Sequence, residues 1–162
     1  VADGVFPIWM SPEKSNVLMS SIQKGLDKSG KTLMDFDIAP FVTVVIGDDV
    51  DHCRMPIKGS MALYIGGMGA RENNFYNDYA KALGYEEAAV KIQDLFLAGK
   101  KDEAMAAVPD ELVDACHLVG PAGRIKERLQ VWKEAGDSGK ISSMLLGAGQ
   151  IEALELVAGE LL

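Results

Sequence analysis

Cysteine and histidine are scarce in this sequence, with two of each among 162 residues. Cys53 and Cys116 lie far apart, so a disulfide framework is not expected and the chain suits a reducing cytoplasm. No Ser–His–Asp or Cys–His set can be assembled from so few histidines. The pairs His52-Cys53 and Cys116-His117 lack the spacing of zinc ligands, which stand two to four residues apart. We therefore expect no metal site, but two partly buried cysteines that act as small hydrophobic residues beside two surface imidazoles.

Positive charge and long apolar runs are also in short supply. Lys and Arg number 16 against 24 Asp and Glu, which gives a net charge of −8. A general nucleic-acid binder needs a basic face, so nucleic acid is not an expected partner. No apolar run approaches the roughly 18–20 residues that span a bilayer, so no membrane partner is expected either. The length suits a single domain over residues 1–162.

Apolar strands alternate with amphipathic helices, which predicts the α/β class with a parallel sheet. We expect about three strands, at residues 5–10, 38–46 and 141–146. The Ser-Pro-Glu sequence at residues 11–13 predicts a helix start, and Gly30 is its expected end. A last helix is predicted over residues 151–162.

Residues 73–134 have mainly helical spacing. Gly99, Pro109 and the pair Gly120-Pro121 are expected to divide this region into four pieces. Upstream, Asp48 or Asp49 could begin another helix, which Pro56 should end or kink. The Asp residues near the strand ends are expected mainly to be caps and turn residues.

Two segments could contact a ligand. Trp9, Met10 and Ser11 lie where a strand passes into its helix, the end of an α/β unit at which active sites gather. Residues 66–71, with Gly66, Gly67 and Arg71, could bind a phosphate through backbone amides and the guanidinium. This segment matches neither GxGxxG nor the Walker pattern, so the competing interpretation is a turn between two helices.

A series of motifs is similar to one known family. It comprises ALYIGGMGAR at 62–71, NFYN at 74–77, IQDLFLAG at 92–99, AVPDELVD at 107–114, LVGP at 118–121, and residues 125–136. ADGVFPI at 2–8 and FDIAP at 36–40 precede these in the same order. Together they resemble the luciferase-like monooxygenase superfamily, in its branch of coenzyme F420-dependent oxidoreductases, over about residues 1–136.

The resemblance implies a (β/α)8 barrel of about twice this length. The three expected strands would be near the sixth, seventh and eighth, so the chain would form half a TIM barrel with several inserted helices. The start at Val1, directly before a strand, fits a cut through a longer protein. The residues 137–140 depart from the family pattern and affect the expected position of the last strand.

The resemblance also implies a function and a site. A complete member would transfer a hydride between F420, or alternatively FMN, and a small organic substrate, or carry out monooxygenation. Trp9, Met10 and Ser11 would face the cofactor, and the turn with Gly66, Gly67 and Arg71 would lie in the inserted region. No residue is assigned as the catalytic acid. The alternative function is a non-catalytic, self-assembling half-barrel or a small-ligand module, and a homodimer is expected from the open sheet edges.

Overall fold

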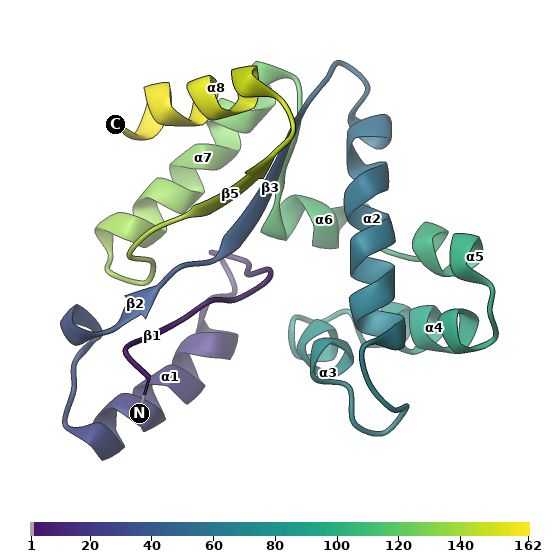
Figure 1. The fold of residues 1–162 in the computed structure, drawn as a ribbon, viewed down its shortest axis with the longest axis horizontal. Helices are drawn as coiled ribbons and strands as arrows, with labels where there is room; N and C mark the ends of the chain where they lie inside the picture. Colours follow the sequence, from purple (N-terminus) through teal and green to yellow (C-terminus); the bar gives the residue numbers. More distant parts are fainter. Residues whose placement is uncertain (1) are drawn as a thin grey trace. The chain divides into compact units, whose positions relative to one another are not determined.

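The structure is a computed structural model that describes residues 2–162, and these divide into two compact units. Unit 1 contains residues 2–50 and 115–162, and unit 2 contains residues 51–114. The strands all belong to unit 1, and unit 2 is helical (Figure 1). No helix within residues 2–162 is both long and apolar enough to cross a membrane.

Unit 1 contains five short strands that pair in parallel. Strand β1 (Gly4–Val5) pairs with β2 (Asp37–Ile38), while β3 (Phe41–Ile46) lies between β4 (Leu118–Gly120) and β5 (Leu145–Ala148). The α/β class and the parallel pairing are therefore confirmed. The strand predicted over residues 5–10 is much shorter, and the one over 38–46 is interrupted before Phe41 because Pro40 has no N–H to donate.

Strand β4 was not predicted, although it supplies one neighbour of the central strand. Its three residues are all buried between two helices, too short a run for alternation to be visible in the sequence. The order β4-β3-β5 also differs from chain order. In a (β/α)8 barrel each strand lies beside its neighbours along the chain, whereas here β5 lies beside β3 and not beside β4.

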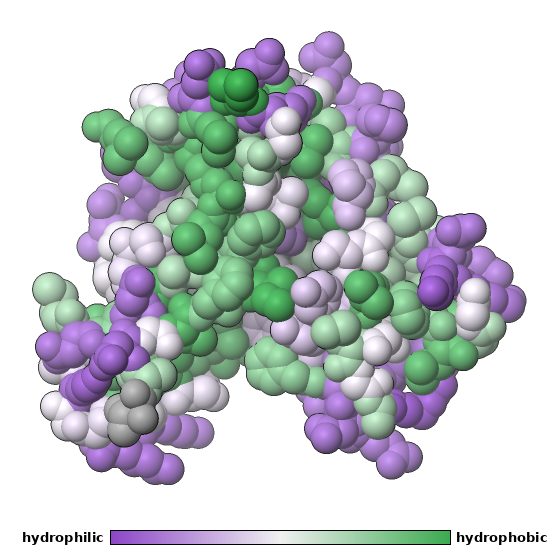
Figure 2. All heavy atoms as spheres, in the orientation of Figure 1, coloured by the Kyte–Doolittle hydropathy of each residue, from purple (hydrophilic) through white to green (hydrophobic). Residues whose placement is uncertain are grey.

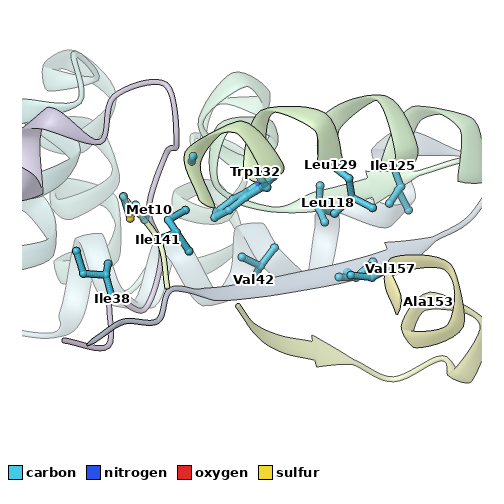
Figure 3. Packing of buried hydrophobic residues seen from close by; sticks show 12 residues of the cluster. Met10, Ile38, Val42, Leu118, Ile125, Leu129, Trp132, Ile141, Ala153 and Val157 are labelled. Atoms are coloured by element: carbon cyan, nitrogen blue, oxygen red, sulfur yellow. The ribbon is translucent and has the colours of Figure 1, made fainter. Parts of the chain in front are cut away.

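Helices α7 (Ala122–Asp137) and α8 (Ile151–Leu161) cover one face of the three-stranded sheet. Helix α1 (Asn16–Ser29) lies beside β1, and a short 3-10 helix spans Leu33–Asp35. Val42 and Val44 alternate with less buried residues along β3, and they pack against Leu129 of α7 and Val157 of α8 in one apolar cluster (Figure 3). The other face, with Phe41, Thr43 and Val45, is only partly buried. Figure 2 shows an apolar strip where Figure 1 places β5.

The helix ends in unit 1 follow the sequence in part. Gly30 ends α1 in the left-handed conformation with φ 67°, as predicted. The helix begins later than expected, at Asn16, because residues 12–15 form turns after Ser11. Asp35 forms a reciprocal capping box with Thr32, which agrees with its predicted role as a cap.

Unit 2 consists of helices that share buried side chains. They are α2 (Val50–Gly67), α3 (Phe75–Ala82), α4 (Glu86–Leu97), α5 (Lys101–Ala106) and α6 (Asp110–Cys116), of which α2 and α6 extend into unit 1 by one and two residues. Pro56 lies inside α2 and does not end it, because it is on an exposed side where water can reach the carbonyl group that loses its donor. The kink, the other predicted effect, stays a prediction. Gly84, with φ 92°, adds a break between α3 and α4 that was not predicted.

Candidate functional site

The carboxyl ends of β3, β4 and β5 meet at one edge of the sheet in unit 1. The Gly47 N–H donates to the Gly120 carbonyl oxygen at 3.2 Å, which joins the ends of β3 and β4. The Gln150 side chain joins β5 to β3, because its Oε1 accepts from the Ile46 N–H at 2.8 Å and its Nε2 donates to the Ile46 carbonyl oxygen at 2.9 Å. Parallel α/β proteins bind ligands outside this end of their strands. The carboxyl edge is therefore the candidate site.

Two helices begin at the carboxyl edge, and an arginine lies beside one of them. Helix α7 starts two residues after β4 and α8 starts three residues after β5, so their first N–H groups lie at this end of the sheet. Arg124 folds back so that its Nε donates to the Val119 carbonyl oxygen at 3.1 Å. Gly120 leaves room for this arrangement, since a Cβ there would lie 2.9 Å from Arg124 Cδ. The carboxyl edge therefore suits an anionic group.

Sequence reasoning did not find Gly120, Arg124 and Gln150 as site residues. The Gly120-Pro121 pair was expected only to divide a helical region, and no role was predicted for Arg124 or Gln150. Only the meeting of three strand ends from distant parts of the chain brings these residues together. A glycine directly after a strand and a short loop into a helix are the signals that could have indicated them.

Trp9, Met10 and Ser11 lie in unit 1 and are almost fully buried, with 4%, 0% and 2% of their surface exposed. Met10 belongs to the apolar cluster with Ile38 and Ile141 (Figure 3). Ser11 Oγ accepts from the Lys14 N–H and donates to Glu13, both at 3.3 Å, so it holds the turn before α1. The structure thus gives these residues packing and turn roles, and their contact with a cofactor stays a prediction.

A charged pair fastens that turn to α7. Arg128 forms an ion pair with Glu13 at 2.5 Å. Burial acts to raise the pKa of Glu13, but hydrogen bonds from Arg128, from the backbone and from Ser11 outweigh it, so the pKa is lowered. Burial, with a contribution from Glu13, raises the pKa of the nearby Cys116 thiol. A thiol with a raised pKa is a poor nucleophile, which leaves Cys116 as a packing residue.

Gly66 and Gly67 end α2 in unit 2, where they allow Phe96 of α4 to approach. A Cβ on Gly66 would lie 2.5 Å from Phe96 Cβ, and one on Gly67 would lie 2.3 Å from Phe96 Cε1. Arg71 follows in the turn to α3 and pairs with Asp94 of α4. These contacts match the interpretation as a turn between two helices. Phosphate binding by this turn stays a prediction.

His117 is buried, which corrects the expectation of a surface imidazole. It is 4% exposed, and its Nδ1 accepts from the Thr43 N–H at 3.1 Å, just before β3 and β4 begin to pair. Burial lowers the pKa of His117 to about 4. Among residues 2–162, no group of three or more His, Cys, Asp and Glu side chains could hold a metal ion.

Comparison with known proteins places these features in a family. The family model described as luciferase-like monooxygenase matches residues 1–139. This chain belongs to the luciferase-like monooxygenase family.

Two curated relatives extend the comparison. Rv3520c of Mycobacterium tuberculosis, whose name describes a candidate coenzyme F420-dependent oxidoreductase, is 35% identical over 98% of this chain and 45% of its own length. The 5,10-methylenetetrahydromethanopterin reductase of Methanopyrus kandleri is 22% identical over 100% of this chain and 45% of its own length. The chain thus spans less than half the length of these relatives.

Solved structures show the fold. The coenzyme F420-dependent tetrahydromethanopterin reductase from Methanopyrus kandleri superposes with a TM-score of 0.68 and 20% identity, over 99% of this chain and 45% of the reductase. An F420-dependent secondary alcohol dehydrogenase gives a TM-score of 0.52 and 16% identity, over 99% of this chain and 41% of the dehydrogenase. The α/β fold, with its parallel strands and many helices, is therefore similar to that of a TIM-barrel-family structure.

Proposed function

We propose that this chain is part of an F420-dependent oxidoreductase that transfers a hydride between the cofactor and a small organic substrate. The observation that supports this most strongly is the family match over residues 1–139, together with a 35% identical relative whose name refers to F420. The M. kandleri reductase and the dehydrogenase point to the same cofactor. The alternative of a non-catalytic, self-assembling module is less well supported, because these relatives carry enzyme names.

The proposal includes the architecture of the complete protein. As the family resemblance implies, the chain would supply the carboxy-terminal half of a (β/α)8 barrel, and its 45% coverage of its relatives is consistent with this. The order β4-β3-β5 departs from that of a complete barrel. The half-exposed face of β3, with Phe41, Thr43 and Val45, would then look into the barrel. Parallel sheets are normally covered on both faces, which supports a further layer here.

The carboxyl edge of unit 1 fits the anionic part of such a cofactor. Arg124 and the first N–H groups of α7 and α8 would hold a phosphate or carboxylate group there. Gln150 would keep the ends of β3 and β5 in place beneath it. When bound, the deazaflavin ring would supply the hydride chemistry, and the protein would orient it and exclude water. Trp9, Met10 and Ser11 would lie next to the ring as predicted, with their buried side chains supporting it from the core.

F420 binding tests this proposal through the fluorescence of the deazaflavin. The isolated 162-residue chain should bind F420 weakly or not at all, because it spans less than half of its relatives. A fusion that places the unmatched portion of Rv3520c before this chain should bind F420 more tightly than FMN. Arg124→Gln in the fusion should weaken F420 binding about tenfold, the effect of losing one charge-assisted contact of about 1.4 kcal/mol. The proposal would be contradicted if the isolated chain bound F420 as tightly as the fusion does, or if the fusion bound only FMN.

A further inference from the structure

Two buried amide side chains of unit 2 each have a polar atom without a hydrogen-bond partner. Asn77 of α3 is 2% exposed, and Gln93 of α4 is 4% exposed. Among residues 2–162, no group forms a hydrogen bond with Asn77 Oδ1 or Gln93 Nε2, so the two amides are not bonded to each other through these atoms. Buried polar groups in folded proteins are nearly always hydrogen-bonded, because an unpaired one has lost its contacts with water without replacement. These two atoms therefore require a partner.

The hydrogen bonds of Asn77 fix which of its atoms lacks a partner. Its Nδ2 donates to the Ile65 carbonyl oxygen of α2 at 3.1 Å and to the Ala89 carbonyl oxygen of α4 at 2.8 Å. A carbonyl oxygen accepts and cannot donate, so the side-chain nitrogen must face these two groups. The remaining atom, Oδ1, can only accept. Asn77 therefore needs a donor, whereas Gln93 Nε2 needs an acceptor.

The side chain of Gln93 lies on the part of α4 that Asn77 contacts. Helices α3 and α4 pack against each other (Figure 1). Ala89, whose carbonyl oxygen accepts from Asn77, precedes Gln93 by four residues, or one helical turn. Long side chains of a helix lean toward its N-terminus, over the turn that precedes them. The Gln93 amide is thus directed toward the turn of Ala89, so the unpaired acceptor and the unpaired donor share one buried region between α3 and α4.

We propose that this region binds one buried water molecule, which donates to Asn77 Oδ1 and accepts from Gln93 Nε2. The need for one donor and one acceptor decides the chemical class of the ligand. A metal cation could not accept from Nε2, and a fully ionised anion could not donate to Oδ1, whereas water does both. Buried waters in proteins typically make roughly two to four hydrogen bonds of this kind.

The water would complete a polar network that joins three helices of unit 2. Asn74 Nδ2 donates to the carbonyl oxygens of Tyr64 and Ile65 near the end of α2, and Asn74 Oδ1 accepts from two N–H groups at the start of α3. Asn77 extends these contacts to α4. The network therefore fixes the start of α3, and with it the end of the turn at residues 68–73. The water site belongs to unit 2 alone and does not depend on a bound cofactor.

The test combines crystal structures of the 162-residue chain, at a resolution that shows ordered water, with urea unfolding of two variants. The wild-type chain should show a water within hydrogen-bond distance of both Asn77 Oδ1 and Gln93 Nε2. Gln93→Met keeps the length of the side chain but removes its amide. This variant should lose the water and raise the unfolding equilibrium constant about tenfold, because Asn77 Oδ1 loses its donor. Gln130→Met makes the same change at an exposed position of α7, so it should keep the water and change the constant less than about twofold.

The direction of the stability change separates the two possibilities. If Gln93 Nε2 has no partner, Gln93→Met removes an unpaired buried donor and should stabilise the chain. A water bound to both atoms in the wild type and in Gln130→Met, with a loss of stability in Gln93→Met, supports the inference. A stabilised Gln93→Met chain overturns it, and so does a wild-type structure with no water between the two atoms or with a direct hydrogen bond between them. The wild-type structure decides the question even if Gln93→Met does not fold.

Discussion

His117 should make this protein lose stability over a defined pH range. The imidazole is buried in unit 1, with a pKa lowered from 6.5 to about 4. The unfolded chain takes up the proton near pH 6.5 and the folded chain does not, so acid favours unfolding. The contribution of His117 to the free energy of unfolding is complete above pH 6.5, falls as the pH drops to about 4, and is lost below that value.

The magnitude follows from the difference in pKa. The full difference between a pKa of 6.5 and one of about 4 corresponds to about 3.5 kcal/mol, of which about 3 kcal/mol is lost by pH 4. That is a large part of a typical unfolding free energy of roughly 5–15 kcal/mol. The carboxylates of Asp3, Glu13, Asp35 and Asp110 also have lowered pKa values, so their loss of stability adds to that of His117 at the acidic end.

The matched variant is His117→Asn. The asparagine oxygen can take the position of Nδ1 and accept from the Thr43 N–H, but the side chain does not titrate. Urea unfolding followed by circular dichroism at pH 7.5, 6, 5 and 4 gives the free energy of unfolding for both proteins. The wild-type chain should lose about 3 kcal/mol relative to His117→Asn between the first and last of these values. Carboxylate effects cancel in this comparison.

A second variant separates the hydrogen bond from the burial. His117→Phe fills the site but leaves the Thr43 N–H without its acceptor, which should cost about 1–3 kcal/mol at every pH. The reasoning is refuted if wild type and His117→Asn lose stability in parallel. It is equally refuted if NMR titration of the folded chain places the His117 pKa near 6.5.

Three further predictions concern packing and polar contacts, all measured by urea unfolding. Gly66→Ala should destabilise the chain by about 1–3 kcal/mol, because the new Cβ would clash with Phe96. Gly59→Ala on the same helix should not destabilise it, since its Cβ would meet only Met105 Sδ at 3.6 Å. Equal effects of the two substitutions would contradict the packing role of Gly66. Arg54→Lys should lower the free energy of unfolding by about 1.5–3 kcal/mol, because lysine cannot reproduce the two hydrogen bonds of 3.1 and 2.6 Å from Arg54 to Asp114. The same hydrogen bonds raise the pKa of Arg54. An unchanged stability would argue against a stabilising role for these two bonds. Gln150→Ala should lower the free energy of unfolding by about 1–3 kcal/mol, because it leaves the N–H and the carbonyl oxygen of Ile46 without these partners. Gln150→Glu should lose less, because its carboxylate oxygen can still accept from the Ile46 N–H. Equal losses in both variants would contradict the role of the Gln150 amide.

The sequence was most informative where local chemistry decides the structure. Gly30 ends α1 because only glycine adopts its φ of 67° at little cost, and Thr32 and Asp35 cap each other within four residues. The last helix was also predicted correctly, at Ile151–Leu161. Each of these features depends on residues that are close together in the chain, so the local sequence contains all the residues that determine it.

Prediction was weaker where burial decides. Trp9 and Met10 were expected in a strand because they are apolar, yet they lie outside β1 and fill the core as single residues. His117 was expected at the surface because histidine is polar, yet it is buried and its Nδ1 accepts from the N–H of Thr43, which is distant in the sequence. An apolar residue next to a strand and a histidine next to a cysteine carry no local sign of which way they face.

The order of the sheet shows the same limit at a larger scale. The alternation of Val42 and Val44 predicts a strand, but nothing in β3 itself states which strands lie on its edges. Two residues in or next to β5 fix its place beside β3. Gly147 allows the close approach, because a Cβ at that position would lie 2.4 Å from Phe41 Cζ. Gln150 hydrogen-bonds to both the N–H and the carbonyl oxygen of Ile46. A glycine and a glutamine that look like ordinary loop residues therefore select the edge on which β5 packs. Because the strand ends that meet at the carboxyl edge depend on this selection, the candidate site could be recognised only after the sheet order was known.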